Sequence, residues 1–234
     1  MESVQEKKTA LLLFTRSSEE EAVLKDFSNV QSYSTNLQIA ENLILQTRRI
    51  IRESGIPCFI ISSSDQYGKS FGEKIKNAFA DVFQLGYENV IAIGNDCPSL
   101  TPYDLIKAEN ELNNFNAVCG PASDGGLYLI GLNFRFFQQD FFKHLSWESE
   151  NIAEDFQNYL SQLNASFILS EVKNDIDNNY NIIQTLKNKT ISILLRTNLT
   201  SLLASLRVYP DMFLQHLISS QIRIYSSLRA PPVY

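Results

Sequence analysis

The sequence predicts an α/β fold with a mostly parallel central sheet. Short runs rich in Ile, Val, Leu and Phe alternate along the chain with longer segments in which apolar residues recur at helical spacing. This alternation is typical of parallel strands joined by crossover helices. The chain has 234 residues, of which 44% are hydrophobic and 11% aromatic, and this is enough to bury one large core. We therefore expect one main domain.

Strands are expected at the short apolar runs and helices at the longer periodic segments. The expected strands are Ala10–Thr15, Cys58–Ser62, Val90–Gly94, Ala117–Gly120, Leu127–Gly131 and Ser166–Ser170. The expected helices are Asn36–Glu53, Phe71–Leu85, Pro102–Asn113, Ser149–Leu163 and Asn179–Lys187. Thr101 is a suitable N-cap for the third helix, and Pro102 suits its first position.

Beyond Thr190 the sequence changes to two Leu/Ile/Ser-rich segments at helical spacing, separated by Tyr209-Pro210. Proline favours a break between two helices. From Lys187 onward there are six basic residues and one acidic residue, so this tail differs in charge from the rest. We expect a main domain at residues 1–189 and a helical extension at 190–234 that packs on the domain or forms a homodimer.

Composition excludes several classes of partner. A net charge of −6 disfavours broad attraction to nucleic acid or anionic lipid. No apolar run approaches the roughly 18 residues that suggest a membrane span, and "ALLLF" is too short for a signal-peptide core. The chain has an odd number of cysteines, Cys58, Cys97 and Cys119, and their spacing is not that of a metal site. This favours reduced structural thiols. We expect a cytoplasmic protein that binds no nucleic acid.

The stretch "IGNDCPSL" places Asp96 two residues after an expected strand. In an open parallel sheet, ligands bind beyond the carboxyl ends of the strands. A carboxylate there is a natural ligand for Mg²⁺ or Mn²⁺, which in turn binds phosphate oxygens. The alternative is that Asp96 or Ser99 caps a turn or the following helix.

The stretch "GPASDGGLYLIG" places Asp124, Gly125 and Gly126 between two apolar runs. Asp-Gly-Gly in this setting is a strong hairpin signal. The same residues could form a backbone-lined pocket floor for a sugar or a base, because glycine allows close approach to the main chain. Both interpretations stay open from the residues alone.

Asp175 and Asp177 are two residues apart in "KNDIDNNYNI". In an extended segment their side chains face the same way, so both carboxylates could converge on one site. Asp96 and one of this pair would supply metal ligands from separate segments. The alternative is that Asp177 or Asn178 caps the following helix.

Other polar groups indicate no chemistry. His144 has no companion at ligand or triad spacing, and no Ser, Cys or Lys lies in a nucleophile motif. Residues 19–21 are three glutamates, which are most simply a solvated face at the start of a helix.

Taken in order, several segments resemble the bacterial family of GT-A-type glycosyltransferase-like proteins. These segments are "ALLLFTR", "QYGKSFGEKIKNAF", "GYENVIAIGNDCPSLTPYDL", "GPASDGGLYLIGL", "LSWESENI" and "DIDNNYNI". The family is related to nucleotide-diphospho-sugar transferases and to nucleotidyltransferases such as the phospholactate guanylyltransferases. The resemblance spans about Ala10 to Leu186 and implies a Rossmann-like GT-A three-layer α/β/α domain. It also implies a nucleotide or nucleotide-sugar donor held through Mg²⁺ or Mn²⁺.

The resemblance also implies roles for individual residues. Asp96 matches the metal-binding aspartate, and Asp175 or Asp177 would complete the metal site. Asp124 matches the acceptor-side or sugar-side loop, which makes Asp96 and Asp124 the candidate catalytic residues. The candidate substrate-binding residues are Arg16, Gln66, Gly68, Gly72, Glu73, Asn95, Gly125 and Gly126.

The loop after the first strand departs from the family pattern. Relatives have a Pro-Gly turn and a Lys-Thr-Arg-Leu-like run there, whereas this chain has "TRSSEEEAVLKDF" with only Arg16 and Lys25 as cations. Glycine-rich loops offer free N–H groups to phosphates, and three glutamates would repel them. Two hypotheses follow: a metal-dependent glycosyl or nucleotidyl transferase with an unknown acceptor, or an inactive descendant that binds a ligand or partner.

Overall fold

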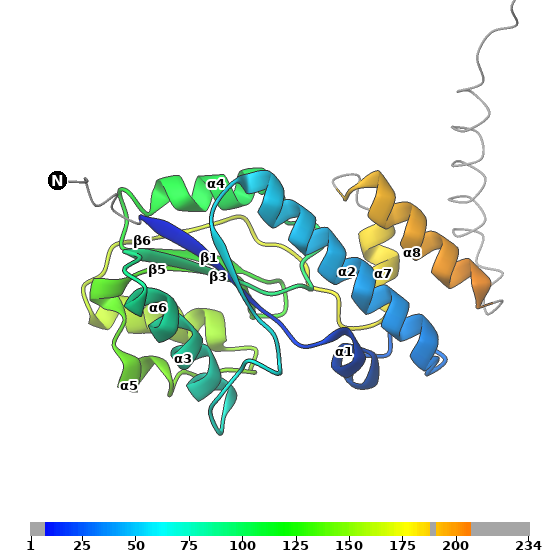
Figure 1. The fold of residues 1–234 in the computed structure, drawn as a ribbon, viewed down its shortest axis with the longest axis horizontal. Helices are drawn as coiled ribbons and strands as arrows, with labels where there is room; N and C mark the ends of the chain where they lie inside the picture. The colour runs from blue at the N-terminus through cyan, green and yellow to red at the C-terminus, as the bar shows by residue number, and fades with distance from the viewer. Residues whose placement is uncertain (1–7, 188–190, 207–234) are drawn as a thin grey trace, which may run out of the picture.

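In the computed structural model, residues 8–187 and 191–206 are described. A six-stranded sheet forms the centre, in the order β2-β1-β3-β5-β4-β6 (Figure 1). The strands are β1 (Thr9–Phe14), β2 (Cys58–Ile61), β3 (Asn89–Ile93), β4 (Ala117–Pro121), β5 (Leu127–Asn133) and β6 (Phe167–Leu169). The pairs β1–β2, β1–β3 and β4–β6 are parallel, and β5 is antiparallel to both of its neighbours. The predicted mostly parallel sheet is confirmed, and β5 reverses direction because a tight turn joins it to β4.

Helices cover both faces of the sheet (Figure 1). On one face lie α3 (Phe71–Gln84), α5 (Gln139–Phe142) and α6 (Ile152–Gln162), with the aromatic side chains of Phe79, Phe142 and Tyr159 fully buried. On the other face lie α2 (Tyr33–Ser54) and α4 (Pro102–Glu111), which bury Ile50 and Leu105. The fold is therefore a three-layer α/β/α arrangement, as predicted.

Strand β1 shows how the sequence produces two cores. Ala10 and Leu12 belong to the cluster under α3 and α6, whereas Leu11 and Leu13 belong to the cluster under α2 and α4. Successive side chains of a strand point to opposite faces, so a continuous apolar run serves a strand that is covered on both sides. All four side chains are 0% exposed.

A third cluster lies at the end of the sheet, between α2 and two further helices, α7 (Asn179–Lys187) and α8 (Ile193–Ser205). It contains Ile39 and Leu43 of α2, Ile182 of α7 and Leu199 of α8. The first helix of the predicted extension therefore packs against the main domain. The second predicted helix and the break at Tyr209-Pro210 lie outside the described residues, and the boundary at residue 190 stays a prediction.

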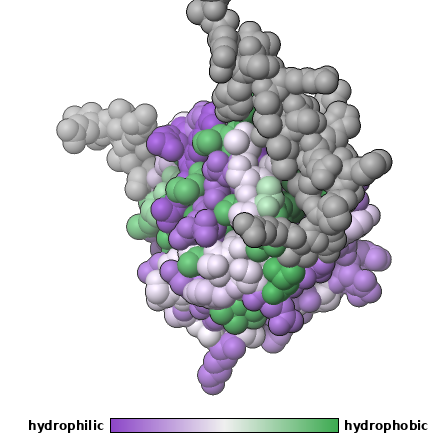
Figure 2. Space-filling view, turned by 90° about the vertical axis from the view of Figure 1, so that its right-hand side faces the viewer, coloured by the Kyte–Doolittle hydropathy of each residue, from purple (hydrophilic) through white to green (hydrophobic). Residues whose placement is uncertain are grey.

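Two short elements were not predicted: α5 and a 3-10 helix at Phe134–Phe136. The helix expected to start at residues 19–21 is present as α1 (Ser18–Leu24). Figure 2 views the side of the molecule on which α1 and α8 lie, and it shows hydrophobic patches among hydrophilic ones. The exposed apolar side chains of these two helices include Val23, Leu24, Ile193 and Leu194. Within the described residues, no helix is both long and apolar enough to cross a membrane.

Candidate ligand-binding site

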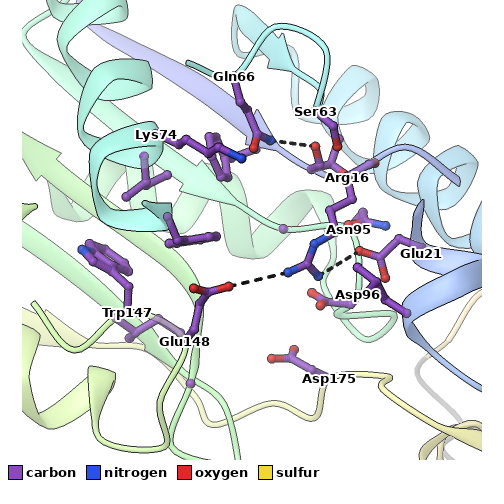
Figure 3. Close-up of a pocket in the computed structure, with 18 of the residues that line it drawn as sticks. Arg16, Glu21, Ser63, Gln66, Lys74, Asn95, Asp96, Trp147, Glu148 and Asp175 are labelled. Carbon is purple, nitrogen blue, oxygen red and sulfur yellow. Dashed lines mark hydrogen bonds and ion pairs between the residues drawn. The ribbon is translucent and has the colours of Figure 1, made fainter. Parts of the chain in front are cut away.

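A cavity of about 1150 Å³ lies beyond the carboxyl ends of β1 and β3. Its walls come from the segments that follow β1, β2 and β3 and from the turn between β4 and β5, and the labelled side chains of Figure 3 surround one common space. This is the edge at which open α/β sheets bind ligands. Of the predicted site residues, the cavity is lined by Arg16, Gln66, Asn95, Asp96, Asp124, Gly126 and Asp175.

Asp96 lies three residues past the end of the fully buried strand β3 and lines the cavity. All five residues of β3 are buried, Asn95 is 5% exposed, and the Asp96 side chain is 30% exposed. The backbone N–H of Ile176 donates to the Asp96 carbonyl at 2.8 Å. This bond fixes the segment that holds Asp175 and Asp177 beside the end of β3, so the structure brings the three carboxylates together.

Lys25 lies among these carboxylates. Its Nζ is 3.0 Å from Asp96 Oδ2, 2.9 Å from Asp177 Oδ1 and 3.4 Å from Glu21 Oε2. It also donates to the Ile176 carbonyl at 3.1 Å, and its side chain is 11% exposed. Burial alone would lower the pKa of this ammonium, but attraction to Asp96, Glu21 and Asp177 outweighs burial, so the pKa is raised. Lys25 therefore keeps its charge throughout the physiological range.

Asp175 lines the cavity next to Asp96 (Figure 3). Its Oδ1 is buried and has no hydrogen-bond partner among the described residues. Burial, followed by the negative charges of Asp96, Asp124 and Asp177, raises the pKa of this carboxyl to about 8. Asp175 is therefore mostly protonated at neutral pH.

The predicted metal ligands Asp96, Asp175 and Asp177 do not form an open metal site. In the described part of the chain, no three His, Cys, Asp or Glu side chains are arranged to hold a metal ion. Lys25 fills the space between Asp96 and Asp177, and a metal at Asp175 would have to displace its proton. This donor set does not fit a three-carboxylate site for Mg²⁺ or Mn²⁺.

Arg16 crosses the cavity in the loop after β1 (Figure 3). Its guanidinium lies 3.6 Å from Glu21 Oε1 and 3.9 Å from Glu148 Oε1. The Arg16 side chain is 40% exposed and that of Glu148 is 60% exposed, so the pair they form is weak. Glu148 has φ of 65°, a left-handed conformation that residues other than glycine seldom adopt and that is enriched at ligand sites. Arg16 can therefore exchange Glu148 for an anionic ligand.

The three consecutive glutamates do not form one solvated face. Glu19 and Glu20 are exposed, and Glu20 also accepts hydrogen bonds from the Ser17 backbone and the Ser63 hydroxyl. Glu21 is only 4% exposed and pairs with Arg16 and Lys25. The expectation of a solvated face is wrong for Glu21, because two cations compensate its burial. Sequence reasoning missed Glu21 and Lys25, although their spacing of four in a helix could have indicated the pair.

Four of the predicted substrate-binding residues, Gln66, Gly68, Gly72 and Glu73, lie before or at the start of α3, and only Gln66 lines the cavity. Gln66 does line it, and its Nε2 also donates to the Thr15 carbonyl at 2.9 Å. Glu73 Oε2 accepts from the Lys69 backbone at 2.6 Å, which caps the helix. A Cβ on Gly72 would lie 2.1 Å from the Lys143 carbonyl, so this glycine allows close packing. Gly68, Gly72 and Glu73 are not part of the cavity lining.

The Asp-Gly-Gly turn agrees with both sequence interpretations. Asp124 Oδ1 accepts from the Gly126 N–H at 2.9 Å, which closes the turn between β4 and β5. Gly125 has φ of 88°, and a Cβ there would lie 1.9 Å from the Glu150 carbonyl. Asp124 and Gly126 also line the cavity. The turn is structural, and it presents a carboxylate to the cavity.

Comparison with protein families and solved structures agrees with this architecture. The family model described as "Uncharacterized protein conserved in bacteria (DUF2064)" matches residues 57–149, which include Asp96 and the Asp-Gly-Gly turn. A structure from Desulfovibrio desulfuricans G20, provisionally named as a nucleotide-diphospho-sugar transferase, superposes with a TM-score of 0.76 at 20% identity. That match covers 89% of this chain and 97% of the other. The chain has the nucleotide-diphospho-sugar transferase fold. The resemblance inferred from the sequence motifs is confirmed at the level of the fold.

Two other solved structures are more distant. Rv0371c from Mycobacterium tuberculosis H37Rv has a TM-score of 0.45 at 10% identity, covering 77% of this chain and 99% of that one. The 4-diphosphocytidyl-2C-methyl-D-erythritol synthase from Anaerococcus prevotii DSM 20548 has a TM-score of 0.45 at 8% identity, covering 87% and 100%. A comparison with curated proteins finds no match.

Proposed function

We propose that this protein is a transferase that binds a nucleotide or nucleotide-sugar in the cavity and passes a glycosyl or nucleotidyl group to an acceptor. The observation that carries the proposal is the cavity itself, which lies at the carboxyl edge of β1 and β3 on a nucleotide-diphospho-sugar transferase fold. Arg16, Asp124 and Asp175 all line it. A large cavity with a few polar groups at this edge is typical of a substrate site.

Arg16 is the group best placed to hold the phosphates of the donor. Its guanidinium is charged at all relevant pH values and can make paired hydrogen bonds to a phosphate. Lys69 and Lys74, at the start of α3, also line the cavity and add positive charge. A diphosphate would form stronger contacts with Arg16 than the exposed Glu148 does, so donor binding is expected to release Glu148.

The acceptor is proposed to lie beside Asp124 and Asp175. When the acceptor hydroxyl oxygen attacks the transferred group, its proton must pass to a base while the bond to the leaving phosphate breaks. With its pKa raised to about 8, Asp175 is ionised in only a minority of molecules at neutral pH, but this ionised form is a stronger base than an ordinary carboxylate, which favours Asp175 for that task. Asp124 would orient the acceptor through the oxygen that the turn leaves free.

A second candidate function is ligand binding without turnover. The loop after β1 has no glycine, and Lys25, one of its two cations, is fully occupied by carboxylates and a carbonyl. This loop therefore leaves Arg16 as its cation for a diphosphate. The observation favours an inactive descendant that retains the cavity.

Isothermal titration with a panel of nucleotides and nucleotide-sugars tests the proposal. We expect at least one member to bind, and Arg16→Gln to weaken that binding by about tenfold or more, the usual loss for a charged hydrogen bond. Arg135→Gln, at an exposed position that does not line the cavity, is the matched control and should bind as the wild type does. Absence of binding across the panel would contradict the proposal. With an acceptor present, a transferase would release nucleoside diphosphate or pyrophosphate from the bound ligand. An inactive descendant would release neither.

A further inference from the structure

Four oxygen atoms surround the ammonium of Lys25. They come from three separate segments: Glu21 in α1, Asp96 after β3, and the Ile176 carbonyl with Asp177 between β6 and α7. The four distances to Nζ lie between 2.9 and 3.4 Å. Carboxylates and a carbonyl converging from separate segments are the ligand types that a divalent cation uses.

The observed distances are those of an ammonium and not of a metal. Divalent cations bind protein oxygens at about 2.0 to 2.6 Å. An ammonium has three protons to donate, and the three nearest oxygens, at 2.9, 3.0 and 3.1 Å, match that number. Lys25 is also the C-cap of α1, where its backbone N–H donates to the Glu21 carbonyl. Its position is fixed by both main chain and side chain.

We propose that Lys25 is the resident cation of this site: its ammonium stands in the place between Asp96 and Asp177 that the sequence assigned to a divalent ion, and phosphorylated ligands bind without such an ion there. A covalently attached cation cannot dissociate, so one positive charge stays between the two carboxylates whether or not metal is present. Binding of the ligand's phosphates then depends on Arg16. The statement about ligands rests on the proposed function, whereas the statement about the cation does not.

A titration of the protein with Mn²⁺, followed by electron paramagnetic resonance, tests the cation. We expect the wild type to show no specific Mn²⁺ site in the micromolar range. Lys25→Met leaves three carboxylates and a carbonyl, so it should bind one Mn²⁺ per chain at least about tenfold more tightly than the wild type. Adding Asp96→Asn to Lys25→Met should abolish that site. Lys107→Met, which removes the same charge from an exposed position on α4, is the matched control and should behave as the wild type.

Two results of the Mn²⁺ titration would overturn the proposal. One is a micromolar Mn²⁺ site in the wild type that Asp96→Asn removes. The other is a folded Lys25→Met variant that gains no Mn²⁺ affinity. Circular dichroism will show whether Lys25→Met folds. If it does not, the Mn²⁺ titrations of the wild type and of Asp96→Asn test the proposal without it.

Ligand binding gives a second, independent readout on the wild type. Any nucleotide or nucleotide-sugar that binds should do so with equal affinity in EDTA and in Mn²⁺, within about threefold, and a larger dependence on Mn²⁺ would count against the proposal. If no ligand of the panel binds, the proposed function fails while the Mn²⁺ titration still decides the role of Lys25.

Discussion

Lys25 and Asp96 are 71 residues apart in the sequence, yet Lys25 Nζ donates to Asp96 Oδ2 at 3.0 Å. This contact joins the end of α1 to the end of β3, and the additional contact with Asp177 joins both to the segment before α7. One ammonium therefore holds together three of the segments at this edge of the sheet.

Replacing Lys25 should lower the stability of the fold. Lys25→Met leaves Glu21, which is buried, and Asp96, which is largely buried, without their shared cation. Breaking a buried ion pair costs roughly 3–5 kcal/mol, and partial exposure of Asp96 and Asp177 places this variant near 2–3 kcal/mol. Urea denaturation followed by circular dichroism measures the change. Lys107→Met should stay within about 0.5 kcal/mol of the wild type, and an equal effect of both variants would contradict the argument.

Asp175 should make stability depend on pH. Its pKa is raised to about 8, so the folded state retains a proton that the unfolded chain releases near its ordinary pKa of 3.8. Stability therefore falls as the pH rises from about 4 to about 8, by at most about 1.4 kcal/mol per pH unit from this group. Asp175→Asn removes that loss, so its stability relative to the wild type should increase between pH 5 and pH 7.

Urea denaturation at pH 5, 6 and 7 measures this trend. Asp140→Asn is the control, because Asp140 is 97% exposed and its hydrogen bond and attraction to Lys143 lower its pKa. A difference between Asp175→Asn and the wild type that stays constant over these pH values would show that Asp175 is already ionised in the folded state.

The glycine at the tip of the Asp-Gly-Gly turn should tolerate no side chain. Gly125→Ala combines a φ of 88° with a Cβ only 1.9 Å from the Glu150 carbonyl. Gly86 has a similar φ of 89° but open space around its Cβ position, which makes Gly86→Ala a matched control for backbone strain. We expect a loss of about 1 kcal/mol for Gly86→Ala and of at least about 2 kcal/mol more for Gly125→Ala. Thermal denaturation compares the stability losses of the two variants. Equal losses would mean that the Glu150 backbone moves to make room for the added methyl group.

The cysteine thiols should be unreactive in the folded protein. Burial raises the pKa of Cys58 to about 11 and that of Cys119 to about 12, and it also raises the pKa of Cys97. Because the thiolate is the nucleophile, iodoacetamide at pH 8 should label the native protein slowly and all three cysteines rapidly in urea. Mass spectrometry of the labelled peptides measures this. Rapid labelling of native Cys97 or Cys119 would contradict their burial.

Local signals were sufficient to predict most of the fold. Asn179–Lys187 and the start of α4 were predicted correctly because caps mark these termini: Asn178 Oδ1 accepts from the Asn181 N–H, and Thr101 forms a capping box with Asp104. The helix α5 was missed because four residues are too few to show a period.

The candidate site was predicted less completely. Its location followed from the rule that ligands bind beyond strand ends, and Asp96 lies there. The cation between the predicted ligands could not be foreseen, because no spacing in the sequence relates Lys25 to Asp96 or Asp177. Gly72 and Glu73 were assigned to the site by their motif, whereas the structure shows that they pack and cap α3.

Ile176 connects the helical extension to the site, although the described residues of the extension do not line the cavity. Its side chain is 0% exposed in the cluster with Leu195 and Leu199 of α8, while its neighbours Asp175 and Asp177 face the cavity and Lys25. None of the described residues of α8 lines the cavity. Substitutions in the apolar face of α8 are thus remote from the cavity, but we expect them to shift Ile176 and, with it, the carboxylates on either side, so selection on the cavity would extend to residues of the extension.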